Sequence, residues 1–453
     1  MLKTLENFLS NRKQRVVLNG IESSWEPIYS GVPQGSVLGP LLFLIYINDL
    51  TDNISSNIKL FADDSSLFIK VTDIDRCQKL LSDDLDIITL WAYQWKMQFN
   101  PEIFKQAIEV VFSCKYKKAE HPPLTFNGIP VARMDYTKHL GITLDSKLNF
   151  RKHISEELEK AKKGLSLLKF LSKYLTREKL DLTYKMHVRP YLDYGDVIFH
   201  NCSQDLMSMI ESIQYKAGLL VSGCWQGTNR VKLYNELGWE SLSDRRLFHR
   251  LSLYRKIKTN EAPYYLNPYV LHSLPVGTDR YKRSFFPSCF IEWESLDIAL
   301  KTSTDSNQFK RVYLKNIRPE KNKTYKILDK YGLKLLSCLR VDFSDLRAHR
   351  FDHNFNCADP TCKCGLDEES TDHYLLRCPR FSFSRAALLR SVSDAVNPEL
   401  LNLPLDHLTK ILLFGSSVYN EISNKLIVEA TIRFVKNSNR FKILEAFSEI
   451  NNP

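Results

Sequence analysis

The chain has 453 residues, of which 43% are hydrophobic and 11% aromatic, and this composition excludes a wholly disordered chain because it can bury one large core and several smaller ones. Lysine and arginine outnumber aspartate and glutamate by 63 to 52, which gives a net charge of +11. A basic balance favours a polyanionic partner such as nucleic acid, although a merely basic soluble protein has the same balance.

The sequence shows no targeting or membrane segment. The first residues contain no apolar core followed by a small-residue cleavage site, so we expect no secretory signal. The longest apolar stretch, Leu41 to Ile47, is far shorter than the roughly 20 residues that span a bilayer. We expect a soluble intracellular protein without a membrane partner, in either nucleus or cytoplasm. In such a reducing compartment, its ten cysteines are expected to be thiols or metal ligands.

The first 150 residues alternate between strand and helix patterns. Asn19-Gly20, between residues 14–18 and 25–29, predicts a hairpin because Asn-Gly accepts the positive φ angles of a tight turn. The apolar run of residues 38–50 predicts a buried helix entered through Pro40. A second hairpin is predicted over 58–69, with Asp63-Asp64 at its turn. The other elements expected here are a helix over 80–95 with acidic residues on its polar side, and strands over 107–113 and 140–144.

The rest of the chain reads as mostly helical. Residues 153–174 predict a strongly basic helix, whose buried stripe is expected to comprise Ile154, Leu158, Ala161, Leu165, Leu168 and Leu171. Around that stripe lie Lys160, Lys162, Lys163, Lys169 and Lys173. Further helices are predicted over 180–192 and 206–221, followed by a Pro- and aromatic-rich connection over 262–287, a cysteine-rich segment over 357–378 and a mostly helical tail over 384–447.

Two short motifs suggest chemistry in the first 150 residues. The loop from Gly31 to Pro40 surrounds Gln34 with residues that let the backbone approach a ligand closely, although an ordinary strand-to-helix turn has the same composition. The string Phe61-Ala62-Asp63-Asp64 places adjacent carboxylates at a hairpin tip between apolar strands. Adjacent carboxylates repel each other, so a bound cation explains them, and an acidic solvated turn is the alternative.

The order and spacing of these motifs resemble the reverse transcriptases, in which a Pro-Gln-Gly loop lies against template and incoming nucleotide and an Ala-Asp-Asp hairpin carries metal-binding aspartates. Longer strings narrow the resemblance to the jockey-type LINE elements, which are non-LTR retrotransposons. Ordered blocks of this kind do not arise by chance at any appreciable rate. The blocks are residues 11–16, 31–40, 44–50, 95–101 and 139–142, and the resemblance continues through Arg189–Tyr194 to the cysteine-rich segment.

The resemblance implies a role for individual residues. Asp63 is expected to coordinate both catalytic ions, Mg²⁺ or Mn²⁺, and Asp64 to be its weaker neighbour. Two of the roles given next have a structural alternative. For Lys105 it is an exposed structural lysine, and for the lysines of the basic helix it is a solvated face. The implied substrate contacts are Pro33, Gln34 and Gly35 at template and nucleotide, Lys105 as proton donor to the leaving pyrophosphate, His139, Leu140 and Gly141 at the primer end, and Lys162, Lys163 and Lys169 along the duplex backbone.

The sequence departs from the family pattern at one decisive point. Phosphoryl transfer by two metal ions needs aspartates from two separate strands, with the ions about 4 Å apart. In the family, the first aspartate lies upstream of the segment that matches residues 11–16. Here the only acid before Asn11 is Glu6, in a helical context that does not match. We therefore expect a truncated fragment that lacks the fingers, the first catalytic strand and the upstream endonuclease, and that is inactive by itself.

The cysteine-rich segment predicts a zinc site. Cys362, Cys364, His373 and Cys378 provide four ligands within seventeen positions, which suits one tetrahedral Zn²⁺. The same Cys-Cys-His-Cys element closes the jockey-like proteins. Cys357 is an alternative to Cys362 as a ligand, and buried thiols in a small loop domain are the alternative to a metal site.

We interpret the chain as an α+β partial right-hand polymerase palm with a helical thumb, a small zinc-knuckle region and a helical tail. The expected divisions are 1–150 for the partial palm, 151–245 for the thumb, 246–345 for a helical connection, 346–383 for the zinc knuckle and 384–453 for the tail. The implied partners are an RNA template, a DNA primer and deoxynucleotides. Two other readings remain: a non-catalytic nucleic-acid-binding remnant and an inert pseudogene product.

Overall fold

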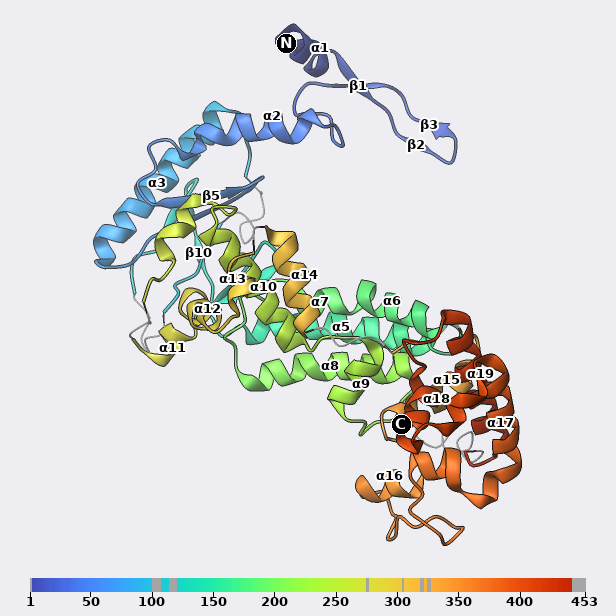
Figure 1. Ribbon diagram of the computed structural model, residues 1–453. Coiled ribbons are helices and arrows are strands. Elements are labelled where there is room, and N and C mark those ends of the chain that lie inside the picture. Colours follow the sequence, from blue (N-terminus) through green and yellow to red (C-terminus); the bar gives the residue numbers. More distant parts are fainter. Residues whose placement is uncertain are drawn as a thin grey trace. The chain divides into compact units, whose positions relative to one another are not determined.

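The computed structural model describes residues 2–99, 107–113, 120–273, 277–303, 305–317, 322–323 and 327–441. The chain divides into two compact units, residues 1–148 and 149–453 (Figure 1). The first unit mixes strands and helices, and the described part of the second is helical apart from one isolated bridge. This mixture is the α+β organisation expected from the sequence, while the finer division into five regions stays a prediction.

The first unit contains short strands paired two by two. In its described part, five strand pairs are antiparallel, and β10 pairs with β7 in parallel. The elements are α1 (Leu2–Leu9), β1 (Arg12–Gln14), β2 (Val17–Leu18), β3 (Ile21–Glu22), β4 (Glu26–Ile28), α2 (Leu38–Ile47), η1 (Asn48–Thr51), β5 (Asn57–Phe61), β6 (Asp64–Phe68), α3 (Ile74–Gln94), β7 (Ile108–Glu109), β8 (Thr125–Phe126), β9 (Ile129–Pro130), β10 (Ala132–Arg133), β11 (Tyr136–His139) and β12 (Ile142–Asp145).

Both predicted hairpins are present. Asn19 and Gly20 have φ angles of 51° and 82°, as the tight turn between β2 and β3 requires. The second hairpin pairs β5 with β6, but its turn consists of Ala62 and Asp63, because Phe61 is paired with Asp64. The strand expected over 107–113 shrinks to β7. The strand expected over 140–144 was wrong at its start, where Leu140 and Gly141 form the turn between β11 and β12.

The two helices of the first unit differ from the sequence expectation in their burial. Helix α2 forms as predicted but is not buried, since Leu41, Leu44 and Ile45 are 54%, 54% and 65% exposed. In α3, the supposed polar side includes Asp84, which is buried, whereas Leu90 is exposed. The continuous apolar run predicted α2 and helical spacing predicted α3, but the apolar side chains of α2 have too little covering structure among the described residues.

A small apolar core joins the elements of the first unit. Its buried members are Ile47, Leu50, Ile88 and Phe126, contributed by α2, η1, α3 and β8. The inward face of the β5–β6 hairpin packs against this core through Ile58, Leu60 and Leu67. The hairpin that carries Asp63 is therefore fixed on one face and open on the other.

The second unit is larger and helical. Its elements are α5 (Arg151–Leu171), α6 (Arg177–His187), α7 (Arg189–Asp193), α8 (Gln204–Ser222), α9 (Arg230–Leu237), α10 (Leu242–Lys258), η2 (Tyr264–Tyr269), α11 (Asp279–Lys282), α12 (Phe285–Glu294), α13 (Ile298–Lys301), α14 (Ser306–Ile317), α15 (Lys330–Arg340), α16 (Arg347–Asp352), η3 (His373–Arg377), η4 (Pro379–Phe381), α17 (Ser382–Ala395), η5 (Pro398–Asn402), α18 (Leu405–Phe414) and α19 (Glu421–Asn437). The predicted helices are present, the one over 180–192 being split into α6 and α7. The described part of the tail is mostly helical, as expected.

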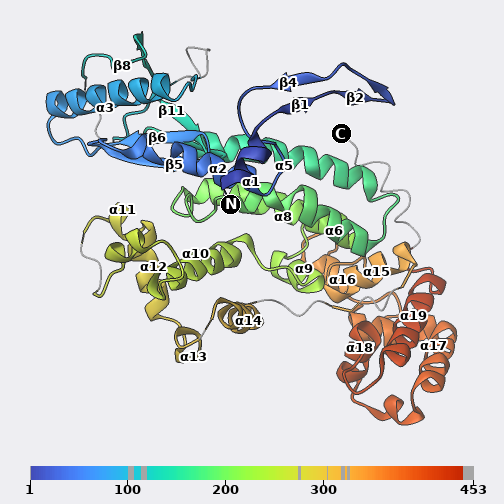
Figure 2. The same ribbon diagram turned by 90° about the horizontal axis from the view of Figure 1, so that it is seen from above.

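Helix α5 packs against α6, α7 and α8, and α6 and α8 can be followed near it in Figure 2. A Cβ atom at Gly164 would lie 2.4 Å from the carbonyl oxygen of His187, so only glycine allows α5 and α6 to approach so closely here. Of the stripe predicted to be buried, Leu165 and Leu171 are only half-buried. The buried residues of that stripe and the close contact at Gly164 hold one face of α5 against the bundle. The opposite face is exposed to solvent.

Buried ion pairs connect distant parts of the second unit. Glu236 of α9 is 1% exposed and accepts hydrogen bonds from Arg177 of α6 at 2.7 Å and Arg340 of α15 at 3.3 Å. Ser337 and Asn322 also donate to this carboxylate, at 3.0 and 2.6 Å. The charge of Glu236 is thus fully paired, and the contacts join the α5–α9 bundle to the C-terminal helices.

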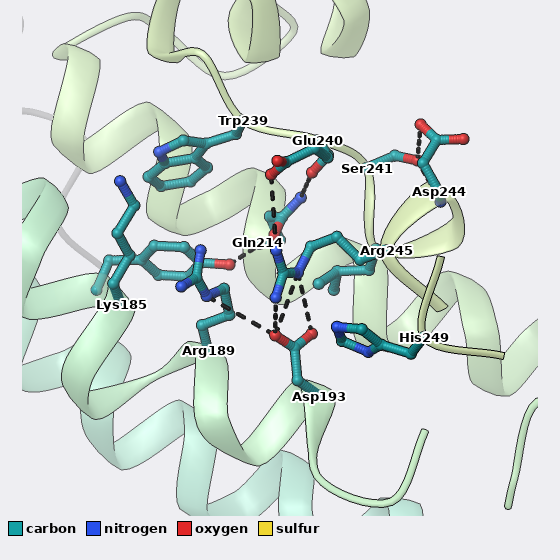
Figure 3. Close-up of polar contacts among 12 residues, drawn as sticks. Lys185, Arg189, Asp193, Gln214, Trp239, Glu240, Ser241, Asp244, Arg245 and His249 are labelled. Atoms are coloured by element: carbon teal, nitrogen blue, oxygen red, sulfur yellow. Dashed lines mark hydrogen bonds and ion pairs between the residues drawn. The ribbon is translucent and has the colours of Figure 1, made fainter. Parts of the chain in front are cut away.

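The family-like segment Arg189–Tyr194 has a structural role in this bundle. Figure 3 shows Asp193 between Arg189 and Arg245, and the Nη2 atom of Arg245 lies 2.7 Å from the carboxylate. Beside this pair, the rings of Tyr184 and Trp239 stack with centroids 4.2 Å apart. These contacts hold α7 against α10, so the segment stabilises the bundle.

No described helix has both the length and the apolar character needed to cross a membrane.

Candidate functional site

The β5–β6 hairpin presents two exposed carboxylates at its tip. Ala62 and Asp63 form the two-residue turn, and Asp64 begins β6. Both aspartates are exposed, while Ile58 and Leu67 hold the other face of the hairpin against the core. The local sequence therefore produces a fixed apolar base with a negatively charged tip.

The turn contains a strained residue. Ala62 has a φ of 50°, in the left-handed region that residues with a Cβ atom adopt at a cost of roughly 1–2 kcal/mol. Glycine is the usual residue at the first position of such a turn. Strain of this kind is found at sites whose geometry is functionally important.

The structure brings together two motifs that are far apart in the sequence. The turn at Leu140 and Gly141, with φ angles of 47° and 83°, closes the β11–β12 hairpin. His139 at the end of β11 faces β6, where its Nδ1 atom lies 3.4 Å from the Oγ atom of Ser66. The two hairpins assigned by resemblance to catalysis and to the primer end are thus neighbours.

Two further contacts position these elements. Both are buried or half-buried, and the sequence interpretation missed both. Asp84 of α3 accepts hydrogen bonds from the backbone N–H groups of Ser55 and Ser56, each at 2.8 Å, immediately before β5. Asp49 accepts from the indole N–H of Trp91 at 2.8 Å and so joins η1 to α3. A signal for Asp84 was present, because it stands at helical spacing from the apolar residues Leu81 and Ile88.

The loop before α2 has a closed conformation. The hydroxyl of Ser36 donates to the carbonyl of Pro33 at 2.6 Å and accepts from the N–H of Gly39 at 3.1 Å. Gly35 has a φ of 76°, which the reversal of the chain requires. Gln34 lies between these residues with its side chain exposed, so the loop is preformed and open to a ligand.

The described carboxylates do not complete a site for two divalent ions. Across the described ranges, the only group of three or more His, Cys, Asp or Glu ligand atoms within 4.8 Å of one another is the cysteine-rich one. Asp63 and Asp64 thus have no third carboxylate at that distance among the described residues, Glu6 included. Lys105 lies outside the described residues.

The basic helix α5 exposes its predicted lysines. Lys162, Lys163 and Lys169 all lie on the solvent side. Lys162 forms an ion pair with Glu159 at 2.6 Å, and such exposed pairs are weak enough to exchange for a phosphate.

The cysteine-rich segment forms a compact group of ligand atoms. The Sγ atoms of Cys362 and Cys378 are 3.6 Å apart, and the Sγ of Cys364 lies 3.3 Å from the Nε2 of His373. All four ligand atoms lie within 4.8 Å of one another. A tetrahedral zinc ion with bonds of about 2.3 Å to sulfur separates its sulfur ligands by about 3.8 Å, so the observed group has dimensions suitable for Zn²⁺.

The chain fixes these ligands by local hydrogen bonds. Gly365, with a φ of 76°, turns the backbone so that its N–H donates to the carbonyl of Cys362 at 2.8 Å. Burial lowers the pKa of His373, which keeps the imidazole neutral and able to bind a metal. A hydrogen bond from the N–H of Leu366 lowers the pKa of the Cys364 thiol, which favours the metal-binding thiolate.

Two residues near this group, Cys357 and Asp367, differ from the sequence interpretation or complete it. Cys357 is not part of the group, since its thiol donates to the carbonyl of Asp359 at 3.2 Å. Asp367, which the sequence interpretation missed, lies 4.0 Å from the Nδ1 of His373 and 2.9 Å from Arg377. At 4.0 Å the contact with the imidazole is electrostatic and is not a hydrogen bond, and the same carboxylate pairs the charge of Arg377.

The segment is firmly attached to the C-terminal helices. Glu369, which is buried, accepts from Arg440 at 2.7 and 2.6 Å. Cys362 and Cys378 belong to the same apolar core as residues of α15, α17, α18 and α19. The group formed by Cys362, Cys364, His373 and Cys378 is therefore part of the fold of the second unit.

Comparison with known protein families gives a match that lies within the first unit. Residues 2–144 match the family described as reverse transcriptase (RNA-dependent DNA polymerase). The RNA-directed DNA polymerase from mobile element jockey of Drosophila melanogaster is 30% identical over 232 residues, 48% of this chain and 25% of the relative. The probable RNA-directed DNA polymerase from transposon X-element of the same organism is 29% identical over 253 residues, 53% of this chain and 27% of the relative.

The aligned part is about a quarter of the length of these curated relatives. Residues 2–144 nevertheless include the Pro33-Gln34-Gly35 loop, the Asp63 hairpin and the His139 hairpin, the three motifs that carried the resemblance. The chain carries a reverse transcriptase domain and is related to the jockey-type enzymes of non-LTR retrotransposons.

Proposed function

We propose that this chain is part of an RNA-directed DNA polymerase of a non-LTR retrotransposon, with the first unit as an incomplete palm. The observation that carries the proposal is the β5–β6 hairpin, which holds Asp63 and Asp64 on a strained tip next to the His139 hairpin. Its substrates are an RNA template, a DNA primer and deoxynucleotides. Asp63 binds Mg²⁺ or Mn²⁺ once a carboxylate from a second strand is supplied.

The other assigned residues act around this hairpin. The preformed loop of Pro33, Gln34 and Gly35 contacts template and incoming nucleotide, and Lys105 protonates the leaving pyrophosphate. The turn of Leu140 and Gly141 holds the primer end. Support for the loop comes from its closure by Ser36 and the exposure of Gln34, while the role of Lys105 rests on the resemblance alone.

Two observations support the proposal that residues 1–453 alone do not polymerise. The described carboxylates provide only the pair at the hairpin tip, whereas two-metal phosphoryl transfer uses ligands from two strands. Helix α2 is apolar throughout yet exposes Leu41, Leu44 and Ile45, and a helix that is apolar on all sides is normally covered. Another layer of protein is thus needed to complete this unit.

The second unit is proposed to bind nucleic acid as a thumb followed by a zinc knuckle. The exposed lysines of α5 support the first role, and the Cys362, Cys364, His373 and Cys378 group supports zinc binding. A non-catalytic nucleic-acid-binding remnant is the second candidate function, favoured by the incomplete carboxylate set of the first unit.

A fusion experiment tests the polymerase proposal. The segment of an intact jockey-type relative that precedes its match to residues 11–16 is fused to this chain, and incorporation of labelled deoxynucleotide on a primed RNA template is measured with Mg²⁺ or Mn²⁺. We expect metal-dependent synthesis that Asp63→Ala abolishes, because removal of a metal ligand removes the electrostatic stabilisation of the transferring phosphoryl group. Synthesis that survives Asp63→Ala would contradict the role of the hairpin.

A further inference from the structure

The exposed face of α5 and the turn that follows it, which contains Lys173 and Tyr174, carry two stripes of side chains. Positions three or four residues apart lie above one another on a helix. One stripe comprises Lys162, Ser166, Lys169 and Lys173. Its neighbour, one position further along at each step, comprises Lys163, Leu167, Phe170 and Tyr174. A lysine stripe therefore runs beside a stripe that ends in two aromatic rings.

The two rings are exposed although the helix has no structural need for them there. Phe170 and Tyr174 are 60% and 65% exposed, and their centroids are 5.4 Å apart. Helix α5 already buries Ile154, Leu158 and Leu168 on its opposite side. A ring pair at this spacing supports a helix by only about 0.2–0.5 kcal/mol, less than burial of one such side chain contributes.

The charges around the rings favour a polyanion over a protein partner. Lys163 begins the aromatic stripe, whereas Lys169 and Lys173 lie roughly 100° around the helix axis from the rings that follow them in the sequence, so the charges border the rings on the next face. The nearby acid Glu159 is occupied by Lys162. Positive charge beside exposed rings is the combination by which proteins bind single-stranded nucleic acid, with phosphates on the cations and bases on the rings.

We propose that the C-terminal end of α5 and the turn that follows it form a stacking platform for unpaired bases, made by Phe170 and Tyr174, with the lysine stripe on the phosphates of the same strand. The inference rests on the nucleic-acid binding proposed for the second unit and goes beyond it, because bases inside a duplex present no free face for stacking. The site thus recognises a single strand, or the unpaired end of a template, in preference to a blunt duplex.

The test uses the full chain and two probes of the same sequence, a single-stranded oligonucleotide containing 2-aminopurine and the corresponding blunt duplex. Replacing Phe170→Ala and Tyr174→Ala together should weaken single-strand binding by at least roughly 30-fold, because each ring that stacks one base contributes about 1–3 kcal/mol. The quenching of 2-aminopurine should disappear, while the salt dependence of binding and the affinity for the duplex stay unchanged. Replacing Phe170→Trp and Tyr174→Phe should preserve all three signals.

A matched control removes one tyrosine and one phenylalanine that are exposed elsewhere in the second unit, by Tyr264→Ala and Phe383→Ala. This variant should bind like the original chain. Unchanged single-strand affinity in the Phe170 and Tyr174 variant, or an equal loss for the duplex, would overturn the stacking platform. An original chain that binds the duplex but not the single strand would overturn only this inference, whereas binding of neither probe would also overturn the proposed nucleic-acid role.

Discussion

The two units of this chain treat their problematic side chains in opposite ways. The first exposes large apolar side chains, as at Leu44 and Ile45 of α2. The second buries the carboxylate of Glu236 and pairs it with Arg177 and Arg340. Exposed apolar surface indicates an interface that awaits a partner, whereas a buried charge with complete partners indicates a finished fold. The second unit is therefore expected to be stable by itself, and the first to depend on further structure.

Loss of zinc should have the largest effect on the stability of the second unit. Structural zinc contributes apparent binding free energies on the order of 10 kcal/mol in small zinc domains, and Cys378 lies inside the main core of the second unit. We expect about one zinc per chain by elemental analysis, in line with the four ligands, and a lower melting temperature after chelation. Cys378→Ala should lose the metal, whereas Cys357→Ala should keep it. Equal zinc contents in the two variants would refute the assignment.

Breaking the buried ion triad should have the next largest effect. Glu236→Ala leaves two buried guanidinium groups without their shared carboxylate, and such uncompensated charges cost roughly 3–5 kcal/mol. The free energy of unfolding, measured with urea, should fall accordingly. Glu159→Ala removes an exposed carboxylate from an ion pair on α5 and should leave the free energy of unfolding nearly unchanged, because such exposed pairs contribute little. Similar losses in both variants would show that the triad has no special role.

Neutralising three exposed lysines of α5 should remove part of the nucleic-acid affinity without changing the fold. Lys162→Gln, Lys163→Gln and Lys169→Gln together should reduce the slope of log K against log salt by roughly 2–3, because each lost phosphate contact contributes about 0.7–0.9. A filter-binding titration on a primer-template duplex measures this slope. A slope equal to that of the original chain would mean that these lysines only face solvent.

The smallest expected effect concerns the hairpin tip. Ala62→Gly removes the left-handed strain at a φ of 50° and should stabilise the first unit by roughly 1 kcal/mol. Ala92→Gly provides the control, since Ala92 lies within the regular helix α3 and glycine should destabilise that helix by about 1 kcal/mol. Urea unfolding, monitored in the first unit, should give a higher free energy of unfolding for Ala62→Gly and a lower one for Ala92→Gly.

The sequence predicted most elements of the fold because each depended on local chemistry, whereas the roles assigned to the site residues stay predictions. Asn19-Gly20 specified its turn by backbone preference alone, and the spacing of Cys362, Cys364, His373 and Cys378 anticipated one compact group. The turn of the Asp63 hairpin was predicted one residue too late. Only the strand register, which pairs Phe61 with Asp64, determines that Ala62 carries the positive φ.

Burial and long-range pairing could not be predicted in the same way. The apolar run of α2 suggested a buried helix, but exposure depends on which other segments are present to cover it. Asp84 looked like a surface acid because its partners, the N–H groups of Ser55 and Ser56, lie almost thirty residues away. Phe170 and Tyr174 were missed because a helical aromatic residue is usually assigned to the core.

Primer extension by residues 1–453 alone tests the central claim, that the palm is incomplete while the nucleic-acid-binding half is intact. Incorporation of labelled nucleotide on a primed homopolymer is measured with Mg²⁺ or Mn²⁺, alongside binding of the same primer-template. The account predicts salt-dependent binding with incorporation at background level, because the described residues bring no third carboxylate to the Asp63 hairpin. Metal-dependent synthesis by this chain, abolished by Asp63→Ala, would contradict it and would show that another acid completes the site.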